Sequence, residues 1–158
     1  MRHFDQLAEG VRGDLFHREP EAFERDSERS LLAHALGATL YVPATKDDLA
    51  RTVRRRADRG ARSMVIDLED AIADGSVDAA VGSTGAVLSE LSQDPPDSLL
   101  FVRVRTAAQI RELTLALGPG QRIVSGFVLP KFSAKTGEEY LQAVMEIGAR
   151  SAHPVYAA

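Results

Sequence analysis

The sequence lacks cysteine and tryptophan, and none of its apolar runs is long. Without cysteine, the protein has no disulfides, no thiolate metal ligands and no cysteine nucleophile. No run approaches the roughly 20 apolar residues that a membrane-spanning helix requires, and the N-terminus has no apolar stretch typical of a signal peptide. These absences predict a protein with no membrane partner, and they are consistent with a cytoplasmic location.

The charge balance argues against a general attraction to nucleic acids. The formal net charge is −4, so the chain as a whole has no basic surface for a phosphate backbone. One basic run, Arg54–Arg56, lies between Asp48 and Asp58, a pattern that indicates the solvent-exposed face of a helix. The four histidines show no spacing typical of metal ligands, which argues against a zinc site. We expect no nucleic-acid partner.

The chain divides near residue 37. Residues 1–37 are polar and charged, and they predict an N-terminal helical extension whose one or two short helices lie on the main domain. From residue 38 to residue 158, short apolar runs that predict strands alternate with longer segments that predict helices. We expect strands over 39–43, 63–68, 99–104 and 124–129, a fifth strand starting in 153–156, and helices over 27–36, 47–59, 74–92, 106–117 and 135–149.

The strict alternation of strands and helices predicts an α/β fold with a parallel sheet. The strands are apolar nearly throughout, as expected where both faces of a sheet are covered. The uniform repeat favours a parallel (β/α) barrel of TIM type, and a flavodoxin-like open sheet is the alternative. A complete barrel needs at least roughly 200 residues. We therefore expect residues 38–158 to form the N-terminal half of a (β/α)8 barrel, truncated after about four and a half βα units.

The strand predicted over 63–68 ends in closely spaced carboxylates, those of Asp67, Glu69 and Asp70. Carboxylates this close repel one another unless a cation, an arginine or a proton accompanies them, and such hard oxygens suit Mg²⁺ or Ca²⁺. Parallel α/β enzymes place their chemistry at this end of their strands. Alternation puts Asp67 and Glu69 on one side of the strand, whereas the orientation of Asp70 is open. The alternative is structural: Asp70 caps the following helix and Glu69 is exposed to solvent.

The next two predicted strands end in basic residues, Arg103 with Arg105 and then Lys131. An arginine at a barrel mouth must be paired, and its fork matches a carboxylate, so Arg103 could bind Asp67 or Glu69, a substrate carboxylate, or both. Lys131 could hold a substrate carboxylate or orient a neighbouring acid. The alternatives are a surface arginine on an edge strand and an exposed lysine that opens a loop.

Four strand ends match the motifs of one superfamily in order and spacing. The matching segments are Leu40-Tyr41-Val42-Pro43-Ala44 for an LFVPA strand, Asp67-Leu68-Glu69-Asp70-Ala71-Ile72 for DLEDAV, Phe101-Val102-Arg103-Val104 for VRVN, and Val128-Leu129-Pro130-Lys131 for LPK. Over about residues 38–158, the chain thereby resembles the HpcH/HpaI aldolase and citrate lyase beta-subunit superfamily. The N-terminal region, including 2–4 and 35–41, looks like a bacterial subgroup of it, the C–C bond lyases of the TIM-barrel fold, which is associated with stress and tellurium-resistance gene clusters.

The resemblance implies a Mg²⁺-dependent barrel enzyme that cleaves or forms a C–C bond next to the carbonyl of a 2-oxo acid or an acyl-CoA thioester. The metal would polarise the carbonyl oxygen and stabilise the enolate. Arg103 would bind the substrate carboxylate and stabilise developing charge, and the three acids would organise that arginine and the metal-bound waters. The resemblance thus implies that Arg103, Glu69, Asp70 and Lys131 are catalytic, and that Arg103, Asp67 and Arg105 bind a small carboxylate substrate.

Two departures from the family pattern affect the site. The asparagine after VRV in the family is Arg105 here, so the surroundings of the substrate are expected to differ. The family's two direct metal ligands, a Glu and an Asp, lie on later strands. The resemblance therefore assigns no direct metal ligand within residues 1–158, and Glu69 and Asp70 are candidates only for contact with metal-bound water.

These departures set three expectations for the chain by itself. We expect it to lack lyase activity, to bind Mg²⁺ weakly at best, and to form homo-oligomers that cover open sheet edges. The alternative function is a non-catalytic anion-binding or regulatory α/β module that uses the same mouth.

Overall fold

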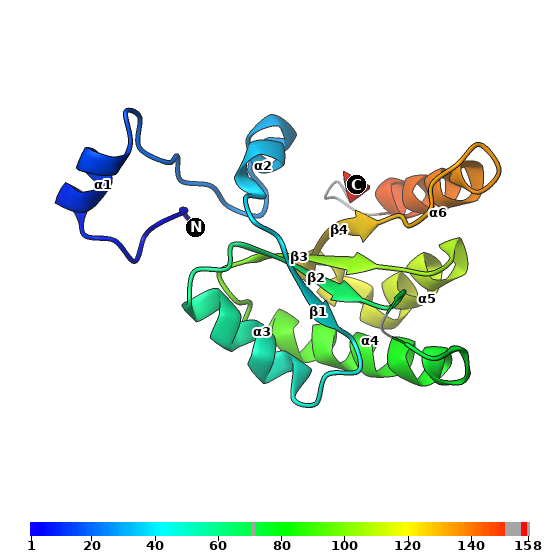
Figure 1. Cartoon of the computed structure of the whole chain (residues 1–158). Coiled ribbons are helices and arrows are strands. Elements are labelled where there is room, and N and C mark those ends of the chain that lie inside the picture. The colour runs from blue at the N-terminus through cyan, green and yellow to red at the C-terminus, as the bar shows by residue number, and fades with distance from the viewer. Residues whose placement is uncertain (71, 151–155, 158) are drawn as a thin grey trace.

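The structure of the protein, a computed structural model, describes residues 1–70, 72–150 and 156–157. Within them, five parallel strands form one sheet, and helices follow the strands in alternation (Figure 1). The strands are β1 (Leu40–Pro43), β2 (Ser63–Asp67), β3 (Leu99–Arg103), β4 (Val124–Val128) and β5 (Tyr156–Ala157). The helices are α1 (Glu9–Leu15), α2 (Arg29–Ala35), α3 (Leu49–Asp58), α4 (Val77–Gln93), α5 (Ala107–Leu117) and α6 (Gly137–Arg150), with 3-10 turns η1 (Asp74–Ser76) and η2 (Gly118–Ile123).

The predicted strands and helices of the alternating region are confirmed, with ends that differ by a few residues. For the fifth strand, positions 153–155 lie outside the described residues. The described part of that strand, β5, pairs in parallel with β4 through Gly126 and Phe127. None of the described helices is long and apolar enough to cross a membrane.

The strand order decides between the two architectures that the sequence allowed. Spatial order follows chain order, β1-β2-β3-β4-β5. A flavodoxin-like sheet would place its first strand between the second and third, so this alternative is wrong. Sequential parallel strands joined by helices are the arrangement of a TIM barrel, and the described strands form part of one.

One face of the sheet packs against the helices that follow the strands. Alternation along β2 and β3 turns Met64, Ile66, Leu100 and Val102 toward this face, where all four are fully buried in the main core. Figure 1 shows α3, α4 and α5 together on this side. Truncating one of these side chains to alanine would cost about 2–5 kcal/mol, because the buried apolar contacts are lost and a cavity remains.

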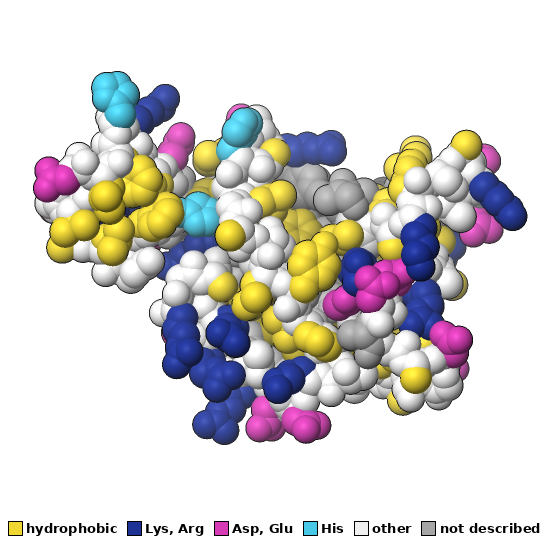
Figure 2. All heavy atoms as spheres, in the orientation of Figure 1, with side chains coloured by type: hydrophobic (Ala, Val, Ile, Leu, Met, Phe, Trp, Pro, Cys, Tyr) yellow, Lys and Arg dark blue, Asp and Glu magenta, His cyan; other side chains and the backbone are white. Residues whose placement is uncertain are grey.

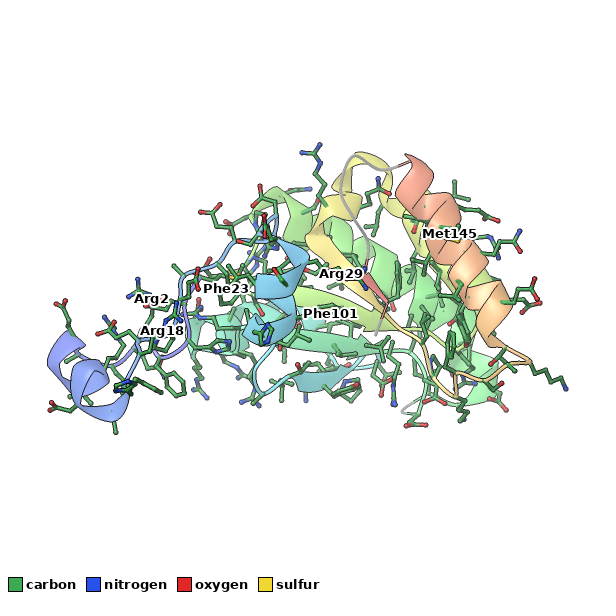
Figure 3. The ribbon with its side chains drawn as sticks, turned by 90° about the horizontal axis from the view of Figure 1, so that it is seen from above. Arg2, Arg18, Phe23, Arg29, Phe101 and Met145 are labelled. Atoms are coloured by element: carbon green, nitrogen blue, oxygen red, sulfur yellow. The ribbon has the colours of Figure 1, made fainter. Side chains whose placement is uncertain are left out.

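The opposite face of the sheet is covered near the N-terminal ends of its strands by the segment that precedes β1. Val65 and Phe101 lie in a second apolar cluster with Phe23 and Leu32, the latter from α2. Figure 3 shows α2 over the strands, with Phe23 and Phe101 beside it. The N-terminal amino group donates to the Phe23 carbonyl at 2.8 Å, which fixes the segment.

The two N-terminal helices differ in how they meet the domain. The expectation that short helices lie on the main domain is correct for α2, which buries Leu32 and Ala35. It does not hold for α1, which buries no residue and projects away from the sheet (Figure 1). The domain boundary near residue 37 stays a prediction.

This cover ends before the C-terminal ends of the strands. Two residues beyond Val65 and Phe101, on the same face, come Asp67 and Arg103. Tyr41 of β1, also on this face by its register with Val65, is exposed. These polar strand ends lie together on one face of the sheet, and we call the region of Tyr41, Asp67 and Arg103, with the residues that follow β2, β3 and β4, the site mouth.

Candidate active site

The centre of the site mouth is a two-point pair between neighbouring strands. Register places Asp67 of β2 directly beside Arg103 of β3. Arg103 Nε donates to Asp67 Oδ1 at 2.8 Å, and Nη2 donates to Oδ2 at 2.6 Å. The Arg103 and Asp67 side chains are 18% and 9% exposed, so the alternative of a surface arginine is wrong. Charged hydrogen bonds of this geometry are roughly twice as strong as neutral ones.

Two further carboxylates contact the same guanidinium. Nη1 of Arg103 lies 3.3 Å from Glu69 Oε2, and Nη2 donates to Asp70 Oδ2 at 2.7 Å. The Glu69 side chain is buried rather than solvated. Asp70 does not cap the next helix, because the N-cap residue of α4 is Ser76 and no side chain caps that helix. Both parts of the structural alternative for these acids are therefore wrong.

These contacts shift the protonation equilibria toward the charged forms. Hydrogen bonding to Arg103 lowers the pKa of Asp70 below its ordinary value of 3.8. The hydrogen bonds to Asp67, followed by those to Asp70, raise the pKa of Arg103 above its already high ordinary value, against the opposing effect of burial. The hydrogen bond between Asp70 and Arg103 thus favours the charged form of both groups.

Lys131 completes the cluster from the end of β4. Its Nζ lies 2.7 Å from Glu69 Oε1, so one carboxylate joins Lys131 to Arg103. The Lys131 side chain is 83% exposed, which agrees with the alternative of an exposed lysine that opens a loop. It nonetheless pairs with the buried carboxylate of Glu69. Its pKa is raised above 10.5, first by the hydrogen bond with Glu69.

The position of Glu69, Arg103 and Lys131 at the ends of successive parallel strands predicts that they converge, and these distances confirm it. Figure 2 shows acidic and basic side chains gathered right of centre, where Figure 1 has the strand ends. The catalytic and substrate-binding roles of these residues, and of Asp67 and Asp70, stay predictions.

Arg105 lies at the same mouth but faces a loop. Its Nη2 donates to the backbone carbonyls of Glu69 and Ile72, each at 2.7 Å, and its Nη1 pairs with Asp74. Arg105, two residues after β3, therefore holds the loop that follows β2. These contacts leave its predicted role in substrate binding untested.

Two tyrosines that the sequence did not single out contact the cluster. The Arg103 guanidinium carbon lies 5.2 Å from the centre of the Tyr41 ring, within the range of a cation–π contact. Tyr140 of α6 donates from its hydroxyl to the Arg105 carbonyl at 2.8 Å. Alternation along β1 could have placed Tyr41 on the site face, whereas Tyr140 comes from a helix and left no comparable signal.

The described residues do not fit a resident metal ion. Among them, no group of three His, Asp or Glu side chains is arranged to hold one. The carboxylates of Asp67, Glu69 and Asp70 are already bound by Arg103 or Lys131. Mg²⁺ requires well-placed oxygens that are free to bind it, and these carboxylates do not offer them.

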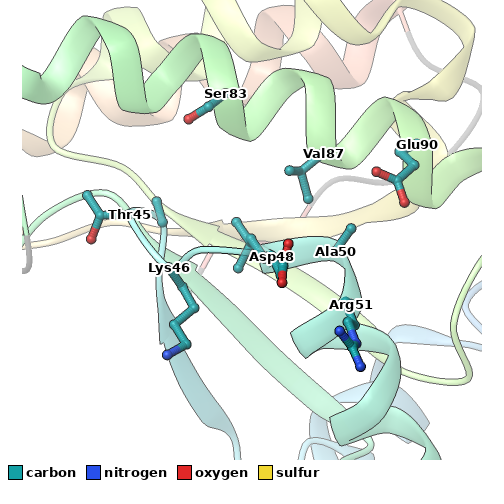
Figure 4. A pocket seen from close by; sticks show the side chains of 10 residues that line it. Thr45, Lys46, Asp48, Ala50, Arg51, Ser83, Val87 and Glu90 are labelled. Atoms are coloured by element: carbon teal, nitrogen blue, oxygen red, sulfur yellow. The ribbon is translucent and has the colours of Figure 1, made fainter.

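A separate pocket lies away from these residues. It has a volume of about 390 Å³ and opens between the segment after β1, the start of α3, and α4 (Figure 4). None of the predicted site residues lines it. Its lining residues are Ala44, Thr45, Lys46, Asp48, Leu49, Ala50, Arg51, Ser83, Val87 and Glu90.

Comparison with known protein families finds one that covers most of the chain. The family described as C–C bond lyase of the TIM-barrel fold matches residues 30–158, so the match begins within α2. A comparison with curated proteins finds no relative of this chain. A match of this extent, on a sheet of barrel topology with charged residues at the C-terminal ends of its strands, shows that the chain belongs to the family of C–C bond lyases of the TIM-barrel fold.

Proposed function

We propose that the site mouth is the substrate site of a C–C bond lyase that acts on a small carboxylate substrate, a 2-oxo acid or an acyl-CoA thioester. The observation that carries the proposal is the Arg103 guanidinium, bound by Asp67, Glu69 and Asp70 at the C-terminal end of a parallel sheet. TIM-barrel active sites lie at this end. A cation held in place before the reaction is suited to stabilise negative charge that develops during it.

The chemistry follows from where charge appears. In the cleavage direction, the bond at the carbon next to a carbonyl breaks and its electron pair forms an enolate. The other fragment leaves as a carbonyl compound, with its hydroxyl proton passing to a base. Arg103 would stabilise the enolate oxygen through Nη1, the nitrogen with the longest carboxylate contact, 3.3 Å. Lys131 would bind the substrate carboxylate, since its side chain is largely exposed.

The acids would act through these cations. Asp67 would hold the plane of the guanidinium with its two hydrogen bonds. Glu69 would couple the two cations, since its Oε2 contacts Arg103 and its Oε1 contacts Lys131. Asp70, whose side chain is the most exposed of the three acids, would yield its place on Nη2 to an incoming substrate anion. Dependence on Mg²⁺ stays a prediction of the resemblance. The described residues are assigned no role as ligands of that ion.

The test is enolate formation, which is detected without knowing the second fragment. The full-length protein is incubated in D₂O with pyruvate, 2-oxobutyrate or acetyl-CoA, with and without millimolar MgCl₂. Proton NMR follows the loss of the signal from hydrogens next to the carbonyl. The proposal predicts exchange with at least one compound, lost in Arg103→Lys and kept in Arg111→Lys. Binding of these compounds without any exchange would contradict the proposal and support a non-catalytic anion-binding module.

A further inference from the structure

Arg105 binds the segment after β2 at three residues. Its guanidinium holds the backbone after β2 at two carbonyls, those of Glu69 and Ile72, and pairs with the Asp74 carboxylate. The Asp74 side chain is fully exposed, so that pair adds little stability. The two carbonyl contacts are therefore the main link between Arg105 and the loop.

The backbone of Arg105 is itself anchored from two helices. Its N–H donates to Gln109 Oε1 at 2.6 Å, and its carbonyl accepts the Tyr140 hydroxyl at 2.8 Å. Gln109 of α5 and Tyr140 of α6 are both buried. Arg105 is thus fixed at its base before its side chain reaches the loop.

Holding the Glu69 carbonyl has a consequence for the Glu69 side chain. Its carboxylate contacts two cations from different parts of the chain, Arg103 in β3 and Lys131 in the turn after β4, so small movements of its backbone would break one contact or the other. The Glu69 N–H also donates to Asp67 Oδ1 at 2.9 Å. The backbone at Glu69 is therefore held on its N–H by Asp67 and on its carbonyl by Arg105.

We propose that Arg105 is a positioning residue, which holds the backbone at Glu69 and Ile72 and so aims the Glu69 carboxylate at Arg103 and Lys131. The chemical role of the aligned site rests on the proposed function, whereas the positioning of Glu69 by Arg105 does not. Lysine cannot replace Arg105 in this role, because an ammonium lacks the planar fork that reaches two carbonyls and a carboxylate together. The competing role is direct binding of the substrate by Arg105.

The test reads the Glu69–Lys131 contact through the titration of Lys131. The sequence has three lysines, Lys46, Lys131 and Lys135, so ¹³Cε-labelled lysine gives few signals to assign. Glu69 and Asp70 raise the pKa of Lys131, Arg105 lowers it, and Tyr140 also faces it. Loss of the positive charge of Arg105 and loss of the Glu69 contact therefore shift this pKa in opposite directions.

Two substitutions of Arg105 separate these effects. If Arg105 positions Glu69, Arg105→Lys and Arg105→Gln both lower the Lys131 pKa, and amide hydrogen exchange in 69–74 becomes faster. If Arg105 acts only by its charge or only on substrate, Arg105→Lys leaves the Lys131 pKa unchanged and Arg105→Gln does not lower it. Either of these results would overturn the proposal. Arg111→Lys, which alters a two-point pair between α5 and α6, is the matched control and should leave Lys131 unchanged.

A second variant keeps the test decisive where the Arg105 variants do not fold. Gln109→Met removes the acceptor of the Arg105 N–H without changing any charge, and it should produce a smaller fall in the Lys131 pKa. No fall in a folded Gln109→Met protein, together with unfolded Arg105 variants, would count against the proposal. None of these measurements needs a substrate. A fall in the Lys131 pKa without enolate exchange would thus uphold the positioning role and contradict the lyase proposal.

Discussion

Asp67 accepts two hydrogen bonds from Arg103, at 2.8 and 2.6 Å, from the position directly beside it in the neighbouring strand. The pairing register of β2 and β3 therefore sets the geometry of the site. Because a one-residue slip of either strand would turn its side chain toward the helices and leave the other on the site face, the fold and the site are specified together.

The first prediction concerns what this pair contributes to stability. Asp67→Asn leaves a partly buried guanidinium without its main counter-charge, and we expect the free energy of unfolding to fall by about 2 kcal/mol. Urea denaturation measures the change. Asp94→Asn is the control, since Asp94 pairs with Arg54 at the exposed surface and should cost less than about 0.5 kcal/mol. Equal effects of the two substitutions would show that the pair adds no stability.

The fold could be predicted from the sequence because its signals are local. Apolar runs such as 63–67 mark buried strands, and the alternation with helices fixes parallel pairing. The separate position of α1 could not be predicted, because its apolar residues Val11 and Leu15 look like a core-facing set but remain exposed. Composition gives the number of apolar side chains in a segment and does not show whether another element covers them.

Strand alternation predicted the centre of the site. Asp67 and Arg103 lie within strands, so their shared face followed from the period of two. Asp70 and Arg105 lie beyond strand ends, where loop conformation sets the direction of a side chain. The family resemblance alone linked Asp70 to Arg103, and the contacts of Arg105 with loop carbonyls could not be predicted from the sequence.

A second prediction uses the titration of Lys131. Glu69→Gln removes the group that raises this pKa most, so the pKa should fall toward 10.5. Because the folded value is raised, the stabilising contact is fully present below pH 10.5 and is lost as the pH rises through the folded pKa. NMR of ¹³Cε-labelled lysine measures the shift. Glu90→Gln, on the exposed side of α4, should leave Lys131 unchanged; an unchanged Lys131 in Glu69→Gln would contradict the contact.

The third prediction concerns metal binding by this chain of 158 residues. The carboxylates of the site mouth are bound by Arg103 and Lys131, so Mg²⁺ would have to displace those cations and also lose water. Calorimetric titration should detect no Mg²⁺ site of micromolar affinity. A stoichiometric micromolar site would contradict the absence of a fitted metal site among the described residues.

Self-association is the subject of the fourth prediction. Among the described residues, β1 and β5 each pair with one strand, and strand edges invite pairing with another chain. Met145 of α6 and Leu115 of α5 are also largely exposed, which adds apolar surface. We expect light scattering of the chain to give the mass of a dimer or a larger homo-oligomer. A monomer across the accessible concentration range would refute this prediction.

The most direct test of the account is the activity of Arg103→Lys in the full-length protein, measured as the rate of enolate exchange or of C–C cleavage. Lysine keeps the charge and loses the fork that Asp67 holds at two points. Losing one transition-state contact of this kind should cost on the order of 3 kcal/mol, or about a hundredfold in rate. Arg111→Lys, the same change at the α5–α6 pair with Glu146, should retain near-normal rates. A hundredfold loss confined to Arg103→Lys is the predicted result, and near-normal turnover of that variant would contradict a catalytic role for Arg103.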